Sequence, residues 1–278
     1  EVLNYMKALR QGLDRLKSLP VSTRLLCEVH KTLTSGVRGG ESSKSPGQLR
    51  TSQNWIGGTG PSNATFVPPP AIEMQRSMSA LEKYINAKKL TPLLIEIGLV
   101  HAQFETIHPF IDGNGRLGRM LITFLLCARK VLREPLLYLS YYFKLHQQEY
   151  YERLQAVRTA GDWEGWIFFF LRGVATVAEE ATERALKIRD LLERDQTRVR
   201  EQLGRRAGKA LDLLDLVTRQ PVVSTHWLIP KLEVSQPTVD KLLIDMQEMG
   251  ILQEITGRSR GRRFAYAEYL ALFEVRYK

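Results

Sequence analysis

The strongest constraint on the fold is a polar, glycine-rich segment that interrupts two apolar runs. Residues 93–107 (LLIEIGLVHAQFETI) and residues 120–132 (MLITFLLCARKVL) both have the spacing of buried helices. Between them stands HPFIDGNGRLGR, residues 108–119, which holds one histidine, one acid, three glycines, an asparagine and two arginines. We therefore expect two packed helices joined by a turn that carries polar chemistry.

The first two thirds of the chain predict a mainly α fold. Helical periodicity dominates up to about residue 208, except in residues 36–70, where glycine, serine and proline are dense. Within that stretch, SPGQLRTSQNWIGG is bounded by glycines and contains apolar Trp55 and Ile56, which argue against simple disorder. The sequence therefore predicts a helical-bundle core over residues 1–190 with a small β-hairpin flap at about residues 46–60.

The C-terminal part of the chain has a different pattern. After a predicted linker helix over residues 191–208, three short helical patterns precede GILQEITGRSRGRRFAYAEY, which alternates like strand, turn and strand. Three helices and a hairpin within about 70 residues are typical of a winged helix-turn-helix domain. We expect this domain to occupy residues 209–278.

Composition limits the classes of protein and partner. A chain of 278 residues with 44% hydrophobic content can bury a sizeable core, and its net charge of +10 favours an anionic partner. No apolar run reaches the roughly 18 residues of a membrane span, so no membrane partner is expected. Cys27 and Cys127 lie in apolar helical settings, which indicates reduced thiols and a cytoplasmic location.

The glycines and arginines of the polar segment predict a phosphate site. Gly113, Gly115 and Gly118 let backbone N–H groups approach a ligand closely, at the positive end of the following helix. Arg116 and Arg119 stand three residues apart, so they project to a common side and would clamp two neighbouring phosphates.

The remaining polar residues add catalytic chemistry. Asp112 would hold a Mg²⁺ ion between phosphates, and Asn114 would add a neutral donor. His108 has the unperturbed pKa suited to a general base near neutrality. His101 lies seven residues earlier, but no third metal ligand accompanies the pair, so we expect His101 to be structural. These residues predict a phosphate-binding turn with a histidine base and leave the reaction open.

HPFIDGNGR followed by LGR matches HxFx(D/E)GNGRxxR in full, and in this the chain resembles the Fic family. The similarity extends to SPGQLRTSQNWIGG, the flap, to FVPPP, and to YYERLQAVRTAGDWEGWIFFFL, so that it covers residues 1 to about 190. The layout is similar to bacterial Fic proteins that carry an inhibitory helix before the core and a winged helix after it. Their inhibitory pattern, (S/T)xxxE(G/N), is absent here, and we expect it upstream of Glu1.

The resemblance implies transfer of AMP from ATP to a Tyr, Ser or Thr hydroxyl of a target protein. In the family mechanism His108 would deprotonate that hydroxyl, its oxygen would attack the α-phosphate, and pyrophosphate would leave. Asp112 would ligate Mg²⁺, while Arg116 and Arg119 would contact the β- and γ-phosphates. The family's phosphate contacts fall on Gly113, Asn114, Gly115, Arg116, Gly118 and Arg119.

Residues outside the loop complete the implied site. Gly115 favours AMP transfer, because a lysine replaces it in the kinase-like branch of the family; a donor other than ATP, such as UTP, stays open. The flap would pair with a target segment by main-chain hydrogen bonds through Arg50, Trp55 and Ile56, unless it is merely a solvated loop. The nucleoside pocket would be formed by Ile56, Gly57, Tyr150, Tyr151 and Arg158, although the two tyrosines also fit ordinary core packing.

Several alternatives remain at this stage. Without the inhibitory pattern the chain is expected to be constitutively active and to modify itself. A nucleotide-sensing transcriptional regulator and, in a longer protein, removal of AMP are the other hypotheses. The predicted wing carries Arg258, Arg260, Arg262 and Arg263, which would contact DNA phosphates. The preceding helix, however, sets Lys241 against Asp240, Asp245 and Glu248, so a protein interface, including a homodimer, competes with DNA.

Overall fold

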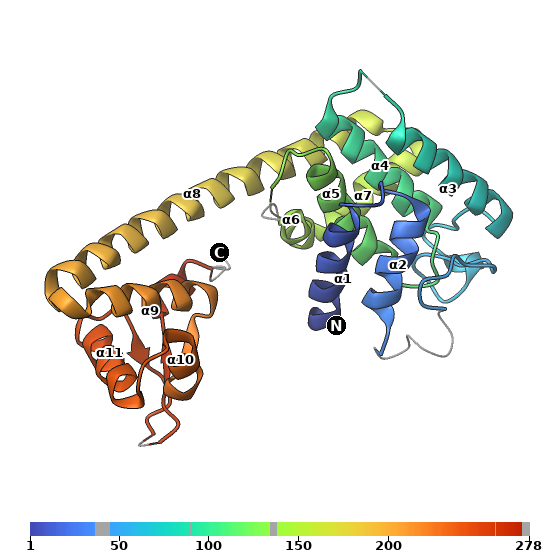
Figure 1. The fold of residues 1–278 in the computed structure, drawn as a ribbon. Helices are drawn as coiled ribbons and strands as arrows, with labels where there is room; N and C mark the ends of the chain where they lie inside the picture. The colour runs from blue at the N-terminus through green and yellow to red at the C-terminus, as the bar shows by residue number, and fades with distance from the viewer. Residues whose placement is uncertain (37–44, 89, 134–137, 259, 274–278) are drawn as a thin grey trace. The chain divides into compact units, whose positions relative to one another are not determined.

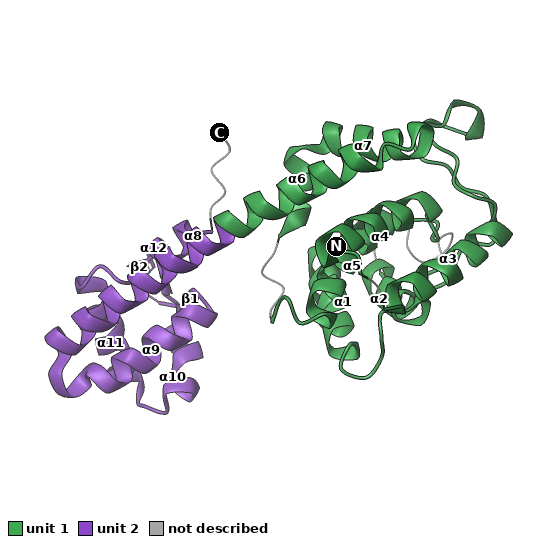
Figure 2. Cartoon of the chain, turned by 90° about the horizontal axis from the view of Figure 1, so that it is seen from above, with its two compact units in different colours: residues 1–179 green, residues 180–278 purple. Residues whose placement is uncertain are grey.

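The chain forms two compact units, Glu1–Glu179 and Glu180–Lys278 (Figure 2). A computed structural model describes residues 1–36, 45–88, 90–133, 138–258 and 260–273 (Figure 1). The boundary between the units falls inside α8 (Trp163–Leu203), and the predicted domain boundary at residue 190 lies in the same helix. Within the described residues, no helix combines the length and the apolar character needed to cross a membrane.

The first unit is a helical bundle around α4 and α5. α4 and α5 pack against each other, α2 and α1 pack on α5, and α3 and α7 pack on α4 (Figure 1). Phe104, Phe110, Phe124 and Trp166 are fully buried among these helices. The helices are α1 (Val2–Arg15), α2 (Thr23–Thr34), α3 (Ala71–Asn86), α4 (Leu93–Ile107), α5 (Asn114–Ala128), α6 (Leu139–Leu145) and α7 (Gln147–Ala160). The predicted helical core is confirmed.

The flap has less β structure than predicted. Its pairing is one bridge, in which Ile56 and Phe66 exchange backbone hydrogen bonds of 2.9 and 3.2 Å. The loop between them includes the short 3₁₀ helix Pro61–Asn63, and the Asn63 side-chain oxygen accepts the N–H groups of Thr59 and Gly60 at 3.0 and 2.9 Å. The pairing residue Phe66 therefore lies beyond the flap predicted at about residues 46–60, and the loop between the paired residues is irregular.

The second unit confirms the predicted winged helix. It contains a three-stranded antiparallel sheet in the order β1-β3-β2, with Val223 opposite Phe264, and the predicted wing joins β2 to β3. Pro237 lies in the first turn of α11, where its missing N–H costs no helical hydrogen bond. The elements are α9 (Ala207–Arg219), β1 (Val222–Ser224), α10 (Thr225–Leu232), α11 (Gln236–Glu248), β2 (Gln253–Glu254), β3 (Arg263–Ala265) and α12 (Ala267–Ala271).

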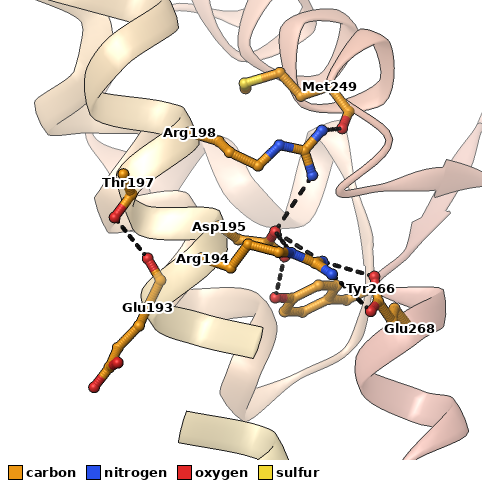
Figure 3. A network of polar contacts seen from close by, with 8 residues as sticks. All are labelled: Glu193, Arg194, Asp195, Thr197, Arg198, Met249, Tyr266 and Glu268. Atoms are coloured by element: carbon orange, nitrogen blue, oxygen red, sulfur yellow. Dashed lines mark hydrogen bonds and ion pairs between the residues drawn. The ribbon is translucent and has the colours of Figure 1, made fainter. Parts of the chain in front are cut away.

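A buried carboxylate ties α8 to the end of the sheet within the second unit (Figure 3). Asp195 is fully buried and accepts a hydrogen bond of 2.6 Å from the Tyr266 hydroxyl. Arg194 donates to the same carboxylate at 2.9 Å and pairs with Glu268 at 2.7 Å. Because every ionised group here faces a partner of opposite charge, the network can remain buried without an isolated charge.

Candidate active site

Two left-handed backbone positions shape the segment between α4 and α5. α4 ends at His108, whose φ and ψ are 49° and 63°, and Gly113 precedes α5 with a φ of 80°. Glycine adopts this conformation easily, whereas a side chain makes it costly by about 1 kcal/mol. The histidine conformation must therefore be held in place by its surroundings.

Arg50 stabilises much of this backbone conformation through hydrogen bonds. The residue is only 2% exposed, and its Nε donates to the carbonyl of His108 at 2.9 Å. Its other guanidinium nitrogens donate to the carbonyls of Ile107, Ser52 and Pro69, the first at 3.4 Å and the second at 3.1 Å. Arg50 thus satisfies carbonyls at the end of α4, which have no partner inside the helix. The predicted contact of Arg50 with a target protein does not fit this buried position.

Asn114 closes the loop on itself. Its Oδ1 accepts the N–H of Phe110 at 2.9 Å, and its Nδ2 donates to the carbonyl of Phe110 at 2.7 Å. Asn54 donates to the same carbonyl at 3.0 Å from the flap. Asn114 is 2% exposed, so its amide first serves the shape of the loop. The sequence predicted a phosphate donor at Asn114 and missed Asn54.

His30, on α2, is a second residue of the site that the sequence pattern did not predict. Its Nδ1 accepts the N–H of Gly47 at 2.9 Å, so the proton lies on Nε2, which donates to the carbonyl of Asp112 at 2.9 Å. The ring stacks on Phe110 with 3.9 Å between centroids. His30 therefore joins α2, the flap and the loop. No motif surrounds it, and the contact to Asp112 spans 82 residues, so the sequence offered no signal.

His108 is the residue of the loop best placed for proton transfer. Burial lowers the pKa of its imidazole to about 4. The main-chain carbonyl of Glu105 opposes this shift, while the cations of Arg158 and Arg50 act in the same direction as burial. Its Nδ1 is buried and makes no hydrogen bond to any residue that the structure describes. The ring is therefore neutral near pH 7 and keeps a lone pair that can accept a proton.

The two arginines of the loop stand beside Asp112 and Gly115. The guanidinium of Arg116 lies 3.6 Å from the Asp112 carboxylate and 3.7 Å from that of Glu1. A Cβ added to Gly115 would lie 3.2 Å from Nη1 of Arg119, so any side chain at position 115 would crowd that guanidinium.

The loop fits a cation that is shared with phosphates. Among the described residues, no cluster of three or more His, Cys, Asp or Glu side chains could hold a metal alone. Asp112, with its side chain 44% exposed, could supply one oxygen ligand. The remaining ligands would then be phosphate oxygens and water, which is common for Mg²⁺.

An aromatic cavity of about 580 Å³ adjoins Arg116 and Arg119. Its volume is within the usual range for small-molecule sites. Tyr150 and Tyr151, predicted for the nucleoside pocket, both line it. Its other aromatic residues are Tyr5, Tyr138, Tyr141 and Phe143.

The other residues predicted for the nucleoside pocket lie elsewhere. Ile56, Gly57 and Arg158 do not line this cavity. Arg158 donates to the carbonyl of Glu105 at 3.0 Å and stacks over the ring of Phe66 at 4.2 Å. Since Phe66 pairs with Ile56, these residues form a separate group that joins α7 to the flap and the end of α4.

His101 is structural, as expected. Its Nδ1 donates to the carbonyl of Gly118 at 3.0 Å, which leaves Nε2 to accept the Tyr150 hydroxyl at 2.9 Å. The ring is fully buried, and burial lowers its pKa to about 3. His101 therefore fixes a wall of the aromatic cavity.

Comparison with known proteins finds two matching segments of the chain. The Fic/DOC family profile matches residues 20–126, and the profile described as an HTH DNA binding domain matches residues 211–264. The helical core and the loop define a Fic-type fold. The chain carries a Fic/DOC domain followed by a helix-turn-helix domain.

Individual relatives extend the comparison. The protein adenylyltransferase Fic of Culex quinquefasciatus is 29% identical over 170 residues, which are 60% of this chain and 29% of that protein. A probable protein adenylyltransferase of Aquifex aeolicus is 33% identical over 69 residues, 25% of this chain and 22% of that protein. The chain thus matches less than a third of these relatives' length. A Fic family protein from Desulfovibrio desulfuricans shares the fold, with a TM-score of 0.58, 20% identity, and coverage of 94% of this chain and 74% of that one.

Proposed function

We propose that this protein transfers AMP from ATP to a hydroxyl side chain of a target protein and releases pyrophosphate. The observation that carries the proposal is the loop between α4 and α5, which brings a neutral His108 and two arginines to one turn beside an aromatic cavity. The relatives named protein adenylyltransferases support the same chemistry.

Each group of the loop has a role in this reaction. His108 accepts the proton of the target hydroxyl, whose oxygen forms a bond to the α-phosphorus while the bond to pyrophosphate breaks. Arg116 and Arg119 hold the departing phosphates, and the N–H groups at the start of α5 stabilise the charge that develops. Bound at Asp112, Mg²⁺ would neutralise phosphate charge. Gly115 keeps space beside Arg119, which favours AMP transfer over phosphorylation.

Nucleotide binding makes His108 a better base. A pKa of about 4 is low for a base that works near neutrality, and neighbouring arginines contribute to that low value. Anionic phosphates offset the field of these cations and stabilise the imidazolium, so they raise the pKa of His108. Proton abstraction is thereby favoured when the donor nucleotide is present.

Intact-protein mass spectrometry tests the proposal. The protein is incubated with Mg²⁺, a cell extract and ATP, UTP, GTP or CTP in turn. The molecular masses of the chain and of the extract proteins are then measured. We expect a gain of one nucleoside monophosphate with ATP, on the chain itself or on an extract protein, and its loss in His108→Ala. The matched control is His226→Ala, which removes an exposed histidine of the second unit and keeps the activity. Absence of any adduct would contradict the proposal.

DNA binding by the second unit is a second candidate function. It is favoured by the contacts that two acidic residues of α11, Asp240 and Asp245, make inside the unit. Asp245 is 5% exposed and pairs with Arg206 and with Lys241, the latter at 3.1 Å. Asp240 accepts the Thr225 hydroxyl at 2.9 Å. Asp245 is thus neutralised by cations of the unit, so α11 presents less negative charge than its sequence indicates, while Asp240, whose partner is neutral, keeps its charge.

Salt dependence of duplex binding tests this second function. Replacing Arg258, Arg260, Arg262 and Arg263 by alanine is expected to weaken binding to generic duplex DNA. The slope of log affinity against log salt should fall by about 0.9 for each phosphate that the variant no longer neutralises. Unchanged binding would favour a protein interface or a homodimer instead.

A further inference from the structure

A buried acid near the phosphate site has no role in the proposed reaction. Glu105 lies on α4, three residues before His108, and is 6% exposed. Its Oε1 is buried and forms no hydrogen bond with any residue in the described ranges. A buried carboxyl oxygen without a hydrogen-bond partner lowers the stability of the fold, so we expect this group to have a role when a ligand is bound.

Glu105 and Arg119 flank the same stretch of α5. A Cβ added to Gly118 would lie 2.3 Å from Oε1 of Glu105, and one added to Gly115 would lie 4.0 Å from it. The Gly115 position is also 3.2 Å from Nη1 of Arg119. The carboxyl oxygen and the guanidinium nitrogen therefore both lie within 4.0 Å of the same Cβ position at Gly115, in the turn that is expected to bind phosphate.

The charges around Glu105 oppose one another. Burial raises the pKa of its carboxyl to about 7, although the cations of Arg119 on α5 and Arg158 on α7 favour ionisation. Arg158 donates to the main-chain carbonyl of Glu105 and so does not hydrogen-bond Oε1. Tyr150 on α7, His101 on α4 and His108 are the other titratable groups nearby. Tyr150 and His101 hydrogen-bond each other as neutral groups, and the imidazole of His108 faces the main-chain carbonyl of Glu105.

We propose that Glu105 is the counter-ion of Arg119 in the nucleotide-free protein and takes up a proton when a nucleotide phosphate binds Arg119. The proposal rests on the proposed function only in placing a nucleoside triphosphate at Arg119. A phosphate bound to Arg119 brings a second anion close to the buried carboxylate, and two anions in a water-poor site repel each other. The proton comes from solvent and neutralises the carboxylate, so the phosphate keeps the arginine.

Linkage between the two events changes the affinity for nucleotide. If one proton binds together with the nucleotide, the dissociation constant rises up to about tenfold per pH unit once the pH exceeds the pKa of the carboxyl in the nucleotide-free protein. Below that pKa the carboxyl is already protonated and the affinity is flat. The site would thus bind nucleotide more tightly at slightly acidic than at slightly basic pH.

Isothermal titration calorimetry of the whole chain tests the proposal. The ligand is α,β-methylene-ATP, which cannot be cleaved between the α- and β-phosphates, at pH 8 in two buffers of different ionisation enthalpy. We expect the wild type to take up nearly one proton per nucleotide. Glu105→Gln, which mimics the protonated acid, should bind without this uptake, and its affinity should no longer fall between pH 7 and pH 8.5.

Glu96→Gln is the matched control, because Glu96 is a buried acid of the same helix that pairs with Arg129 at 3.3 Å. Its proton uptake should equal that of the wild type, and ionisation of the nucleotide itself contributes equally to all three proteins. Equal enthalpies in both buffers, with nucleotide bound to the wild type, would overturn the proposal and leave the proposed function intact. No binding by the wild type would contradict the proposed function itself. His108 is the other group that could take up the proton, so His108→Ala serves as a second variant and should take up the same proton as the wild type. This variant keeps the test decisive if Glu105→Gln fails to fold, and loss of the uptake in His108→Ala would overturn the proposal.

Discussion

Replacing Arg50 by lysine tests whether the active-site loop depends on one buried guanidinium. Its fork donates to four backbone carbonyls, those of His108, Ile107, Ser52 and Pro69. Lysine keeps the positive charge but concentrates its donors on one nitrogen, which cannot reach acceptors on both sides of the fork. If the several hydrogen bonds of Arg50 stabilise the loop, Arg50→Lys will lower the stability of the first unit. If only the positive charge matters, the lysine variant will be as stable as the wild type.

The structure allows the size of the effect to be estimated. Hydrogen bonds from a charged donor contribute about 1.5–3 kcal/mol each, and a lysine would leave about two of the four carbonyls without a partner. We therefore expect Arg50→Lys to lower the free energy of unfolding of the first unit by about 3–5 kcal/mol. For a unit of this length the melting temperature would fall by roughly 10 °C. Transfer activity would fall as well, because the left-handed backbone of His108 would lose its support.

Urea denaturation followed by tryptophan fluorescence measures this loss. Trp227 is the tryptophan of the second unit, so a Trp227→Phe background restricts the signal to the first unit. Arg76→Lys is the control, since Arg76 is exposed on α3 and pairs with the exposed Glu73 at 2.9 Å; its effect should stay within about 0.5 kcal/mol. An Arg50→Lys protein as stable and active as the wild type would refute the role of the Arg50 hydrogen bonds in supporting the loop.

Three further predictions follow from single contacts. Tyr266→Phe removes the hydroxyl that donates to buried Asp195 and should destabilise the second unit by about 2 kcal/mol. The assay is urea denaturation followed by the Trp227 signal, which is the part of the tryptophan fluorescence that a Trp227→Phe change removes. Gly208→Ala places a Cβ that meets nothing within 4 Å on α9, so the same assay should show a gain of about 0.5–1 kcal/mol; a loss would contradict the geometry. His101 has a folded pKa of about 3, below the roughly 6.5 of the unfolded chain, so stability should fall as the pH decreases from about 6.5 towards 3, by up to about 1.4 kcal/mol per unit, in the wild type but not in His101→Gln.

The parts of the fold that follow local rules were predictable from the sequence. Two apolar helical runs on either side of a glycine-rich segment predict α4, α5 and the loop, because periodicity and turn chemistry act over a few residues. The alternating pattern on either side of the wing likewise predicts the strands of the second unit. Pro237 marks the start of α11 for the same reason, since it fits the first helical turn.

The flap was predicted less well, because strand pairing is a long-range choice. The stretch SPGQLRTSQNWIGG has glycine boundaries that suit a hairpin, yet Ile56 pairs with Phe66, beyond the glycines. The Asn63 side chain organises the loop between them, and its hydrogen bonds to Thr59 and Gly60 are invisible in a hydrophobic pattern. Periodicity therefore identifies an ordered segment here but not its partner.

The supports of the site were the least predictable part, since each one is defined by the carbonyl that it meets. Arginine is usually exposed, so nothing in the sequence indicates that Arg50 is buried until the end of α4 presents carbonyls that need donors. His30 has no neighbouring motif, and its role arises only where α2 passes Asp112 and Gly47. Asn114 is the opposite case. Its place in the motif suggests contact with a ligand, yet its side chain makes two hydrogen bonds to the backbone of Phe110 in the loop itself. The chemical groups of this site can therefore be named from twelve consecutive residues. The positions of these groups depend on hydrogen-bond donors from α2 and the flap, which only the tertiary structure brings to the loop.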